Sequence, residues 1–266
     1  MSDLEERSVA LSLRLSLRLS LRRSGALLIG LAFAGAATLF GCIGVSQKRA
    51  TPGIVGGRSA DLRVCHAGTR PASDGTIDDF EDDNTQLPTE GGRDGFWWTT
   101  KDEKGSTLGP DPFSPSEGGA DGSEMSLRAL GKTASSPDAW GVGFGANLLS
   151  SKGALYDASR YVGISFKAKA GPGSATTLRF KIGDVNTHDD AHVCKACWNH
   201  FGKDIGLTNQ WKEYKVMFTE VRQAPYWGDP RPVALTPSKL LSIDFSVGPG
   251  QDYDIWVDDI RFLECQ

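Results

Sequence analysis

The sequence lacks the short motifs that mark most hydrolases and nucleotide-dependent enzymes. No G-x-S-x-G nucleophile elbow, P-loop or H-E-x-x-H zinc motif occurs in its 266 residues. The glycine-rich segment at residues 141–146 resembles a dinucleotide fingerprint, but no strand-helix-strand pattern follows it. Carboxylate pairs such as Asp189 and Asp190 recur too often to mark a glycosidase. We therefore do not expect an enzyme.

Positive charge is not clustered anywhere beyond the N-terminal region. The formal net charge is −4, and no basic block follows residue 42. Nucleic-acid-binding proteins usually carry a clustered basic surface that contacts the phosphates. Nucleic acid is therefore not an expected partner.

Long apolar runs are also missing. The longest, residues 25–40, is shorter than the roughly 20 residues that a membrane-spanning helix needs, but it suits the apolar region of a signal peptide. Basic residues precede it within an LSLR repeat, and the sequence LFGC, ending at Cys42, resembles a bacterial lipobox. We expect a lipoprotein signal peptide at residues 1–42, with Cys42 lipidated. A cleaved secretory signal, an uncleaved anchor or a later start codon are the alternatives.

Residues 43–75 show no periodic apolar pattern and are expected to form a flexible tether. Ile43, in place of an aspartate, gives no inner-membrane retention signal. We therefore expect an outer-membrane-anchored lipoprotein of the cell envelope, or a secreted protein, held to the membrane only through its N-terminal lipid.

Four cysteines remain after the signal segment: Cys65, Cys194, Cys197 and Cys265. An even number in an exported protein favours disulfides, and four cysteines allow three pairings. We favour Cys65 with Cys265 and Cys194 with Cys197. A zinc site made of Cys194, Cys197, His200 and either His188 or His192, or a pair of free thiols, is the alternative in the second region.

From residue 76 onward the chain consists of short alternating runs between glycine, proline, aspartate and asparagine clusters. Such spacing is typical of a β-sandwich. We expect strands at residues 76–83, 96–100, 126–130, 141–148, 161–170, 178–184, 211–218, 240–247 and 253–262. The last of these changes phase between Val257 and Ile260, which predicts a β-bulge at Asp258 and Asp259.

The first and last strands are unusually acidic. TIDDFEDD at residues 76–83 and DYDIWVDDIRF at residues 252–262 interleave large apolar side chains with carboxylates. Buried carboxylates need a neutralising partner, and oxygen ligands suit Ca²⁺. We expect these strands to be neighbours that share a structural calcium ion. The alternative is a pair of solvated acidic strand ends.

Several phrases in order, among them IDDFED, WGVGFGANL, YDASRYVGISFKAKAG and IWVDDIRF, resemble the galactose-binding-like jelly rolls of carbohydrate-binding modules. The sequence resembles family 11 carbohydrate-binding modules and the related intermediate-associated-protein domains of respiratory complex I. The resemblance covers about residues 76–263. It implies an all-β jelly-roll sandwich at residues 76–266, with Ca²⁺ bound by Asp79, Glu81 and Asp258.

A sugar site needs flat aromatic faces together with side chains that make paired hydrogen bonds to hydroxyl groups. Aromatic residues in irregular segments, and polar residues near them, are the candidates. Of the adjacent Trp97 and Trp98, one is expected in the core and the other on the surface. The expected carbohydrate-binding residues are Trp98, Arg179, Asp184, Trp198, His200, Gln223, Tyr226 and Trp227.

The sequence thus predicts a monomeric, non-catalytic lipoprotein that binds a polysaccharide or oligosaccharide. A hydrolase or lyase acting on the same polymers is one alternative. An envelope assembly protein that binds another protein is the other. The sequence does not specify the sugar.

Overall fold

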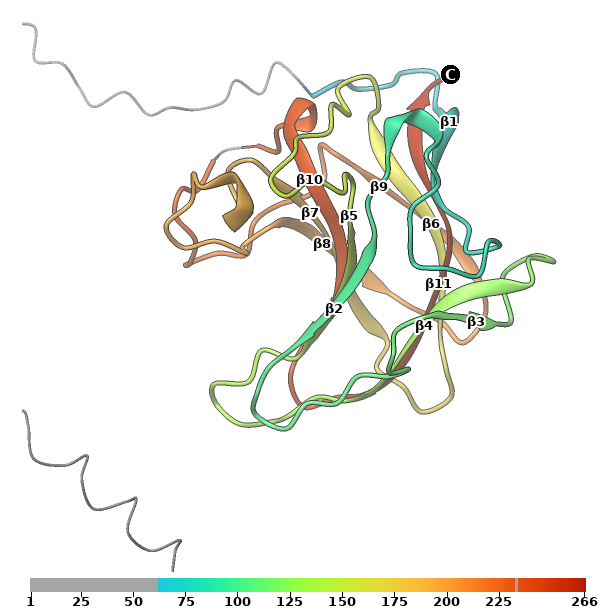
Figure 1. Cartoon of the computed structure of the whole chain (residues 1–266), viewed down its shortest axis with the longest axis vertical. Coiled ribbons are helices and arrows are strands. Elements are labelled where there is room, and N and C mark those ends of the chain that lie inside the picture. The colour runs from blue at the N-terminus through green and yellow to red at the C-terminus, as the bar shows by residue number, and fades with distance from the viewer. Residues whose placement is uncertain (1–61, 233) are drawn as a thin grey trace, which may run out of the picture. The chain divides into compact units, whose positions relative to one another are not determined.

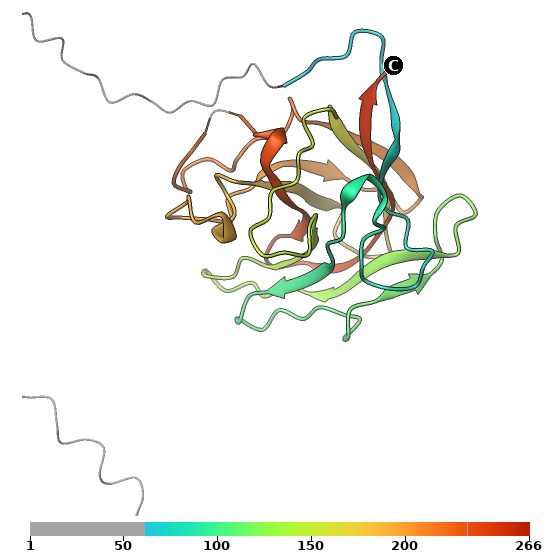
Figure 2. The same cartoon turned by 45° about the horizontal axis from the view of Figure 1, so that its top comes forward.

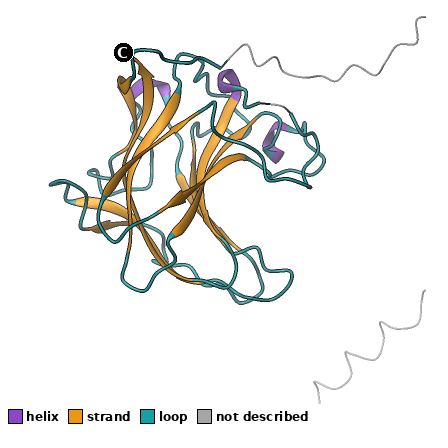
Figure 3. Cartoon of the chain, turned by 180° about the vertical axis from the view of Figure 1, so that it is seen from behind, coloured by secondary structure: helices purple, strands orange, loops and turns teal. Residues whose placement is uncertain are grey.

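The computed structural model describes residues 62–232 and 234–266, in which two antiparallel β-sheets pack face to face (Figure 1). Besides strands and loops, these residues form only three short 3-10 helices, η2 (Glu90–Gly92), η3 (Asp189–Ala191) and η4 (Pro237–Lys239) (Figure 3). None of the described helices is long and apolar enough to cross a membrane. The predicted jelly-roll sandwich is confirmed. The predicted signal peptide, Cys42 and most of the predicted tether lie outside the described residues.

The first sheet has β11 at its centre. Its strands run in the order β3-β4-β11-β6-β9, and β1 pairs with β11 beyond the end of β4. The bounds are β1 (Thr69–Asp78), β3 (Pro115–Glu117), β4 (Met125–Lys132), β6 (Gly163–Ala170), β9 (Lys212–Met217) and β11 (Asp252–Cys265).

The second sheet runs in the order β2-β5-β10-β7-β8. Its strands are β2 (Trp97–Lys101), β5 (Val142–Asn147), β7 (Thr177–Asp184), β8 (Phe201–Gly206) and β10 (Leu240–Val247). The register places Asp244 of β10 opposite Gly145 of β5 on one side and Lys181 of β7 on the other. These three positions define the middle of the sheet's outer face.

The core follows the period-two pattern of the sequence. Every second residue of β6, β7 and β10 is buried between the sheets, as the alternation of side chains along a strand requires. Phe166 of β6 packs against Phe180 of β7 and Phe245 of β10, with ring centroids 5.2 Å apart in both pairs. Burying each such side chain stabilises the fold by about 1.5–3 kcal/mol.

The first and last strands are neighbours, as predicted. β1 pairs with residues 260–265 of β11, and a disulfide joins Cys65 to Cys265 beside this pairing (Figure 2). The predicted domain boundary at residue 76 falls inside β1, which begins at Thr69 because the backbone of this segment hydrogen-bonds to β11. The predicted tether therefore includes residues that belong to the folded sheet.

The predicted bulge is also present in β11. The pairing of β11 with β6 shifts register between Asp258 and Arg261, and Asp259 has a left-handed φ of 49°. The extra residue lets Ile255, Val257, Ile260 and Phe262 all face the core. It also buries the side chain of Asp258 while Asp259 stays partly exposed.

A buried arginine fastens the segment after β1 to the strand. The side chain of Arg93 is fully buried; its guanidinium donates to the backbone oxygens of Asp74 and Thr76 and to the hydroxyl of Tyr156 at 2.6–2.8 Å. It also lies over the rings of Tyr156 and Phe262, each 5.5 Å from the centroid. Carbonyl dipoles and aromatic faces, rather than a carboxylate, thus compensate this buried charge.

Candidate functional site

The middle of the second sheet's outer face has few side chains, because glycines occupy the outward-facing positions of β5. Core residues of β5 alternate with Gly143 and Gly145, whose positions face outward beside Asp244 of β10. A Cβ atom at Gly145 would lie only 2.5 Å from the Cβ of Asp244. Only glycine at position 145 leaves room for the side chain of Asp244 beside the neighbouring strand. We call this part of the sheet's outer face, with the carboxylate of Asp244 on it, the floor.

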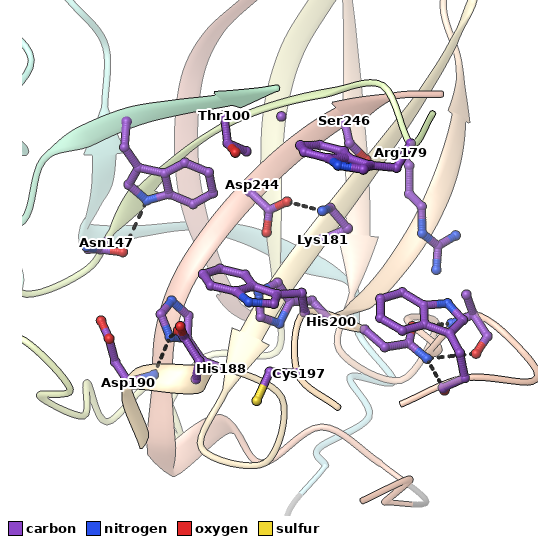
Figure 4. Close-up of a pocket in the computed structure, with 18 of the residues that line it drawn as sticks. Thr100, Asn147, Arg179, Lys181, His188, Asp190, Cys197, His200, Asp244 and Ser246 are labelled. Atoms are coloured by element: carbon purple, nitrogen blue, oxygen red, sulfur yellow. Dashed lines mark hydrogen bonds and ion pairs between the residues drawn. The ribbon is translucent and has the colours of Figure 1, made fainter. Parts of the chain in front are cut away.

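A cleft of about 870 Å³ lies over this floor. Strand residues form its base, and the loop between β7 and β8 forms one wall. In Figure 4, Asp244 and Lys181 meet on the strands, while His188, Asp190 and Cys197 lie on that loop. The volume of the cleft is within the range of small-ligand sites.

Aromatic side chains surround the cleft. Trp140, Trp198 and Trp227 are 50%, 48% and 48% exposed, and Phe96 and Trp98 lie on the β2 side. The predicted division of the Trp97–Trp98 pair is confirmed, because Trp97 is in the core and Trp98 faces the cleft. Large half-exposed apolar side chains gathered at one concave surface usually mark a binding site.

Two of these tryptophans are held by hydrogen bonds. Trp98 donates its Nε1–H to Oδ1 of Asn147 at 3.1 Å. Trp198 has a left-handed φ of 74° and donates its backbone N–H to the oxygen of Thr187 at 2.8 Å. The ring of Trp198 packs against those of His188 and His200, with centroids 4.9 and 5.6 Å away. Ordered rings lose little side-chain entropy on binding, so both are suited to stack against a flat ligand.

The second predicted disulfide, between Cys194 and Cys197, closes a short ring immediately before Trp198. It removes the two thiolates that the alternative zinc site requires, so that alternative is wrong for this structure. The backbone N–H of Lys195 donates to the oxygen of Asp229 at 2.7 Å, which joins this loop to the segment at residues 224–229. The disulfide braces one wall of the cleft.

Asn199 orders the segment that carries Trp227. Its Nδ2 donates to the oxygens of Ala224 and Trp227 at 2.9 and 2.6 Å, and its Oδ1 accepts from the N–H of Ala224 at 2.8 Å. Gln223, a predicted ligand residue, instead donates to the backbone oxygen of Asn199 at 2.8 Å. Asn199 was not predicted from the sequence, and no local pattern marks it.

His200 is buried against the floor and is connected to another predicted residue, Asp184. His200 Nδ1 lies 2.9 Å from Oγ1 of Thr187, and that hydroxyl lies 3.1 Å from Oδ1 of Asp184. Burial lowers the pKa of His200 to about 3 and raises the pKa of Asp184. Asp184 does not line the cleft, but it supports the residue that does.

The charged groups on the floor are paired. Lys181 Nζ lies 2.5 Å from Oδ1 of Asp244, and Nη1 of Arg179 lies 2.9 Å from Oδ1 of Asp204. Asp244 is buried, whereas Asp204 is exposed at the sheet edge. Both cations on the floor are therefore already compensated by carboxylates of the protein.

One group on the wall has the composition of a metal site. Of the described residues, only His188, Asp189 and Asp190 place three potential ligand atoms within 4.8 Å of one another. Nδ1 of His188 already accepts from the backbone N–H of Asp190 at 3.2 Å, and Asp190 pairs with Lys152 at 3.2 Å. Two of the three residues are thus already engaged by the protein.

Two of the three predicted calcium residues, Glu81 and Asp258, contact the segment of residues 118–125, which leads from β3 into the start of β4. Asp258 accepts from the N–H of Ala120 at 2.7 Å, and burial raises its pKa to about 6. Glu81 accepts from the hydroxyl of Ser123 and the N–H of Met125, and these hydrogen bonds lower its pKa. Asp79 is half-buried and contacts only the N–H of Glu81, at 3.5 Å.

The strand predicted at residues 76–83 would place Asp79 and Glu81 on one face, and this part of the prediction is wrong. β1 ends at Asp78, and Phe80 has a left-handed φ of 60°, so the two side chains do not share one face of a strand. Asp78 is the buried carboxylate here; it accepts from Nε1 of Trp97 at 2.7 Å, and burial raises its pKa to about 7. The donor set is all oxygen, which suits Ca²⁺, but the three predicted carboxylates do not meet within 4.8 Å.

Comparison with solved structures identifies this fold among carbohydrate-binding modules. A family 11 module from a cellulosomal cellulase of Clostridium thermocellum is 17% identical, with a TM-score of 0.50, and the match covers 74% of this chain and 94% of that one. A solution structure of CtCBM11 is 19% identical, with a TM-score of 0.51 and coverage of 77% and 99%. The shared feature is the jelly roll. No family model matches the sequence, and neither does any curated protein.

Five of the eight predicted sugar-binding residues line one cleft: Trp98, Arg179, Trp198, His200 and Trp227. Asp184 and Gln223 lie behind it as supports, and Tyr226 is 94% exposed outside it. Trp140, His188, Lys181 and Asp244 also line the cleft but were not predicted as sugar-binding residues. Alternation along β7 and β10 places Lys181 and Asp244 on the sheet's outer face, which is the signal that could have identified them.

Proposed function

We propose that this protein is a non-catalytic module that binds a polysaccharide or oligosaccharide in the cleft on its second sheet. The single observation that carries the proposal is the cleft itself, with half-exposed tryptophans around a polar floor. Aromatic faces pack against the C–H surfaces of sugar rings, while the polar floor offers hydrogen bonds to hydroxyl groups. The shared fold with carbohydrate-binding modules supports this proposal.

Affinity electrophoresis in gels containing β-glucan, xylan or mannan, followed by calorimetry, tests it. We expect retardation by at least one polymer, and at least tenfold weaker binding by Trp140→Ala and Trp227→Ala. Tyr226→Ala is the neighbouring control, because its ring lies outside the cleft. Trp256→Ala is the control for a tryptophan on the other sheet. Equal loss in all four variants would contradict a site in this cleft.

The same preparation separates the two alternatives. Release of reducing sugar that a single carboxylate substitution abolishes would establish a hydrolase. Blank glycan screens, together with cross-linking that captures one envelope protein at the cleft, would favour an assembly role.

We also propose a structural calcium ion between β1, the residue 118–125 segment and β11. Asp79, Glu81 and Asp258 would supply carboxylate oxygens. Burial raises the pKa of Asp258, so a cation that neutralised this carboxylate would stabilise the fold. The thermal midpoint of chelator-treated protein should rise on addition of Ca²⁺ and not on addition of Mg²⁺. Asp258→Asn should remove the response; an unchanged midpoint in the wild type would refute the site.

Finally, we propose attachment to the cell envelope through lipidated Cys42. The full-length protein should partition into detergent, and Cys42→Ser should release it into the soluble fraction. Mass spectrometry of the mature N-terminus distinguishes lipidation from simple cleavage.

A further inference from the structure

The floor of the cleft contains two buried acceptor atoms without a donor, Nε2 of His200 and Oδ2 of Asp244. His200 and Asp244 both line the cleft and are 2% and 1% exposed. Within the described part of the chain, Nε2 of His200 has no hydrogen-bond partner, and neither oxygen of Asp244 has one of normal geometry. Lys181 compensates the charge of Asp244 from one side and leaves Oδ2 uncontacted.

The hydrogen-bond network assigns the tautomer of His200. The hydroxyl of Thr187 accepts from the N–H of Asp184 at 3.1 Å and lies 3.1 Å from Oδ1 of the same residue. Donation of its proton to that carboxylate avoids a contact between two unprotonated oxygens. His200 then donates through Nδ1 to Thr187, and Nε2 carries a lone pair.

Burial keeps this lone pair available. Because burial lowers the pKa of His200 to about 3, the imidazole stays neutral at all ordinary pH values. The nearby charges are those of Asp244 and Lys181, which largely offset one another, and His188 lies alongside with its ring centroid 5.6 Å away. Nε2 is therefore a permanent acceptor.

Buried acceptors without donors are rare in native proteins, and at a cleft they indicate a donor supplied by a ligand. We propose that His200 and Asp244 form a specificity subsite that accepts hydrogen bonds from free hydroxyl groups of a neutral sugar ring. This inference rests on the proposed function and identifies its substrate class.

Charge on the wall and floor excludes acidic sugars. Among the groups that line the cleft, Lys181 pairs with Asp244, Arg179 with Asp204 and Asp190 with Lys152, and the carboxylate left without a lysine or arginine is Asp189. A uronate or a sulfated sugar would bring a carboxylate or sulfate towards these groups without an unpaired cation to receive it. A sugar in which these donating hydroxyl groups are substituted would leave both acceptors, His200 and Asp244, without a donor.

Trp198, on the wall of the cleft, is a neighbour of this subsite. The ring centroids of Trp198 and His200 are 5.6 Å apart, and the rings meet edge-on at an angle of 64°. A sugar stacked flat on Trp198 directs its equatorial hydroxyls sideways, and His200 is the neighbouring side chain on the cleft floor.

Calorimetry with cellohexaose, xylohexaose, mannohexaose and hexagalacturonate tests the proposal. Wild-type protein should bind at least one neutral hexamer at least tenfold more tightly than hexagalacturonate. His200→Phe keeps the aromatic packing and removes the lone pair, and Asp244→Asn keeps the shape and removes an acceptor. Each should weaken binding of the neutral hexamer at least tenfold. Asp244→Asn should not weaken binding of hexagalacturonate.

Matched controls are His66→Phe and Asp252→Asn, both at exposed positions away from the cleft. Circular dichroism and thermal midpoints establish that each variant is folded. Tight binding of a neutral hexamer that both floor substitutions leave unchanged would overturn the subsite and leave the sugar-binding proposal standing. Tighter binding of hexagalacturonate would overturn the substrate class. Failure of every hexamer and polymer to bind would overturn the proposed function itself.

Discussion

Replacement of Asn199 by alanine tests whether hydrogen bonds between two loops hold the cleft in shape. Asn199 is 3% exposed and belongs to the connection between β7 and β8, while its side chain binds the backbone of residues 224 and 227. The substitution removes no ring that would touch a sugar. Asn199 also lines the cleft, but its amide is hydrogen-bonded to the backbone of Ala224 and Trp227, so we expect the loss of affinity to come mainly from displacement of Trp227.

The magnitude follows from three hydrogen bonds. Their donor-acceptor distances are 2.9, 2.6 and 2.8 Å, and each is worth about 1 kcal/mol net, or about 3 kcal/mol together. Trp227 itself is half-exposed, so little apolar burial opposes release of its segment. The cost of ordering the segment then falls on binding, and 3 kcal/mol corresponds to a Kd increased by about 100-fold. We expect an increase of 10- to 100-fold.

Calorimetry with the sugar selected in the screen gives the change in Kd. Hydrogen exchange should become faster in residues 222–229 while the strands keep their protection. Asn84→Ala, at an exposed turn remote from the cleft, is the matched control. A Kd within twofold of wild type, together with unchanged exchange at residues 222–229, would refute the reasoning.

Three further predictions concern stability. Arg93→Met removes three buried hydrogen bonds from a charged donor, so the free energy of unfolding in urea should fall by about 3 kcal/mol, and no loss would show that the guanidinium is merely tolerated. Asp78 and Asp258 have folded pKa values of about 7 and 6 against 3.8 in the unfolded chain, so the native state binds more protons at these two sites. In chelator, the free energy of unfolding of the wild type relative to the Asp78→Asn, Asp258→Asn double variant should decrease by at least about 1 kcal/mol between pH 4 and 7, and the comparison cancels the opposite contribution of His200. An increase over that range would contradict the assignment. Replacing Cys65 and Cys265 by serine opens a link spanning 200 residues and should cost about 5 kcal/mol in the chain-entropy model, measured by chemical denaturation; a change below about 1 kcal/mol would contradict it.

Much of the fold could be predicted from the sequence because its long strands alternate strictly. Phe166, Phe180 and Phe245 lie in runs of period two, and all three are in the core. The short strands β3 and β8 were missed because neither has enough alternating residues to reveal a period. They are strands because β4 and β7 provide backbone partners, which is tertiary information.

The site could be predicted only where chemistry and local sequence coincide. Trp198 and Trp227 were found because aromatic rings in glycine- or proline-containing loops are poorly explained as core. Trp140 lies next to a strand and gave no such signal. Tyr226, adjacent to Trp227, points elsewhere because a left-handed φ of 76° at this residue turns the chain. Such turns depend on contacts with other loops, and the sequence pattern does not encode them.

The disulfide between Cys65 and Cys265 has a mechanical consequence. A pull on the chain ahead of Cys65 passes through this link into β11, which is flanked by β6 on one side and by β1 and β4 on the other. The load is therefore carried in shear by hydrogen bonds of the first sheet. The second sheet, which contains the cleft, lies off this line of force.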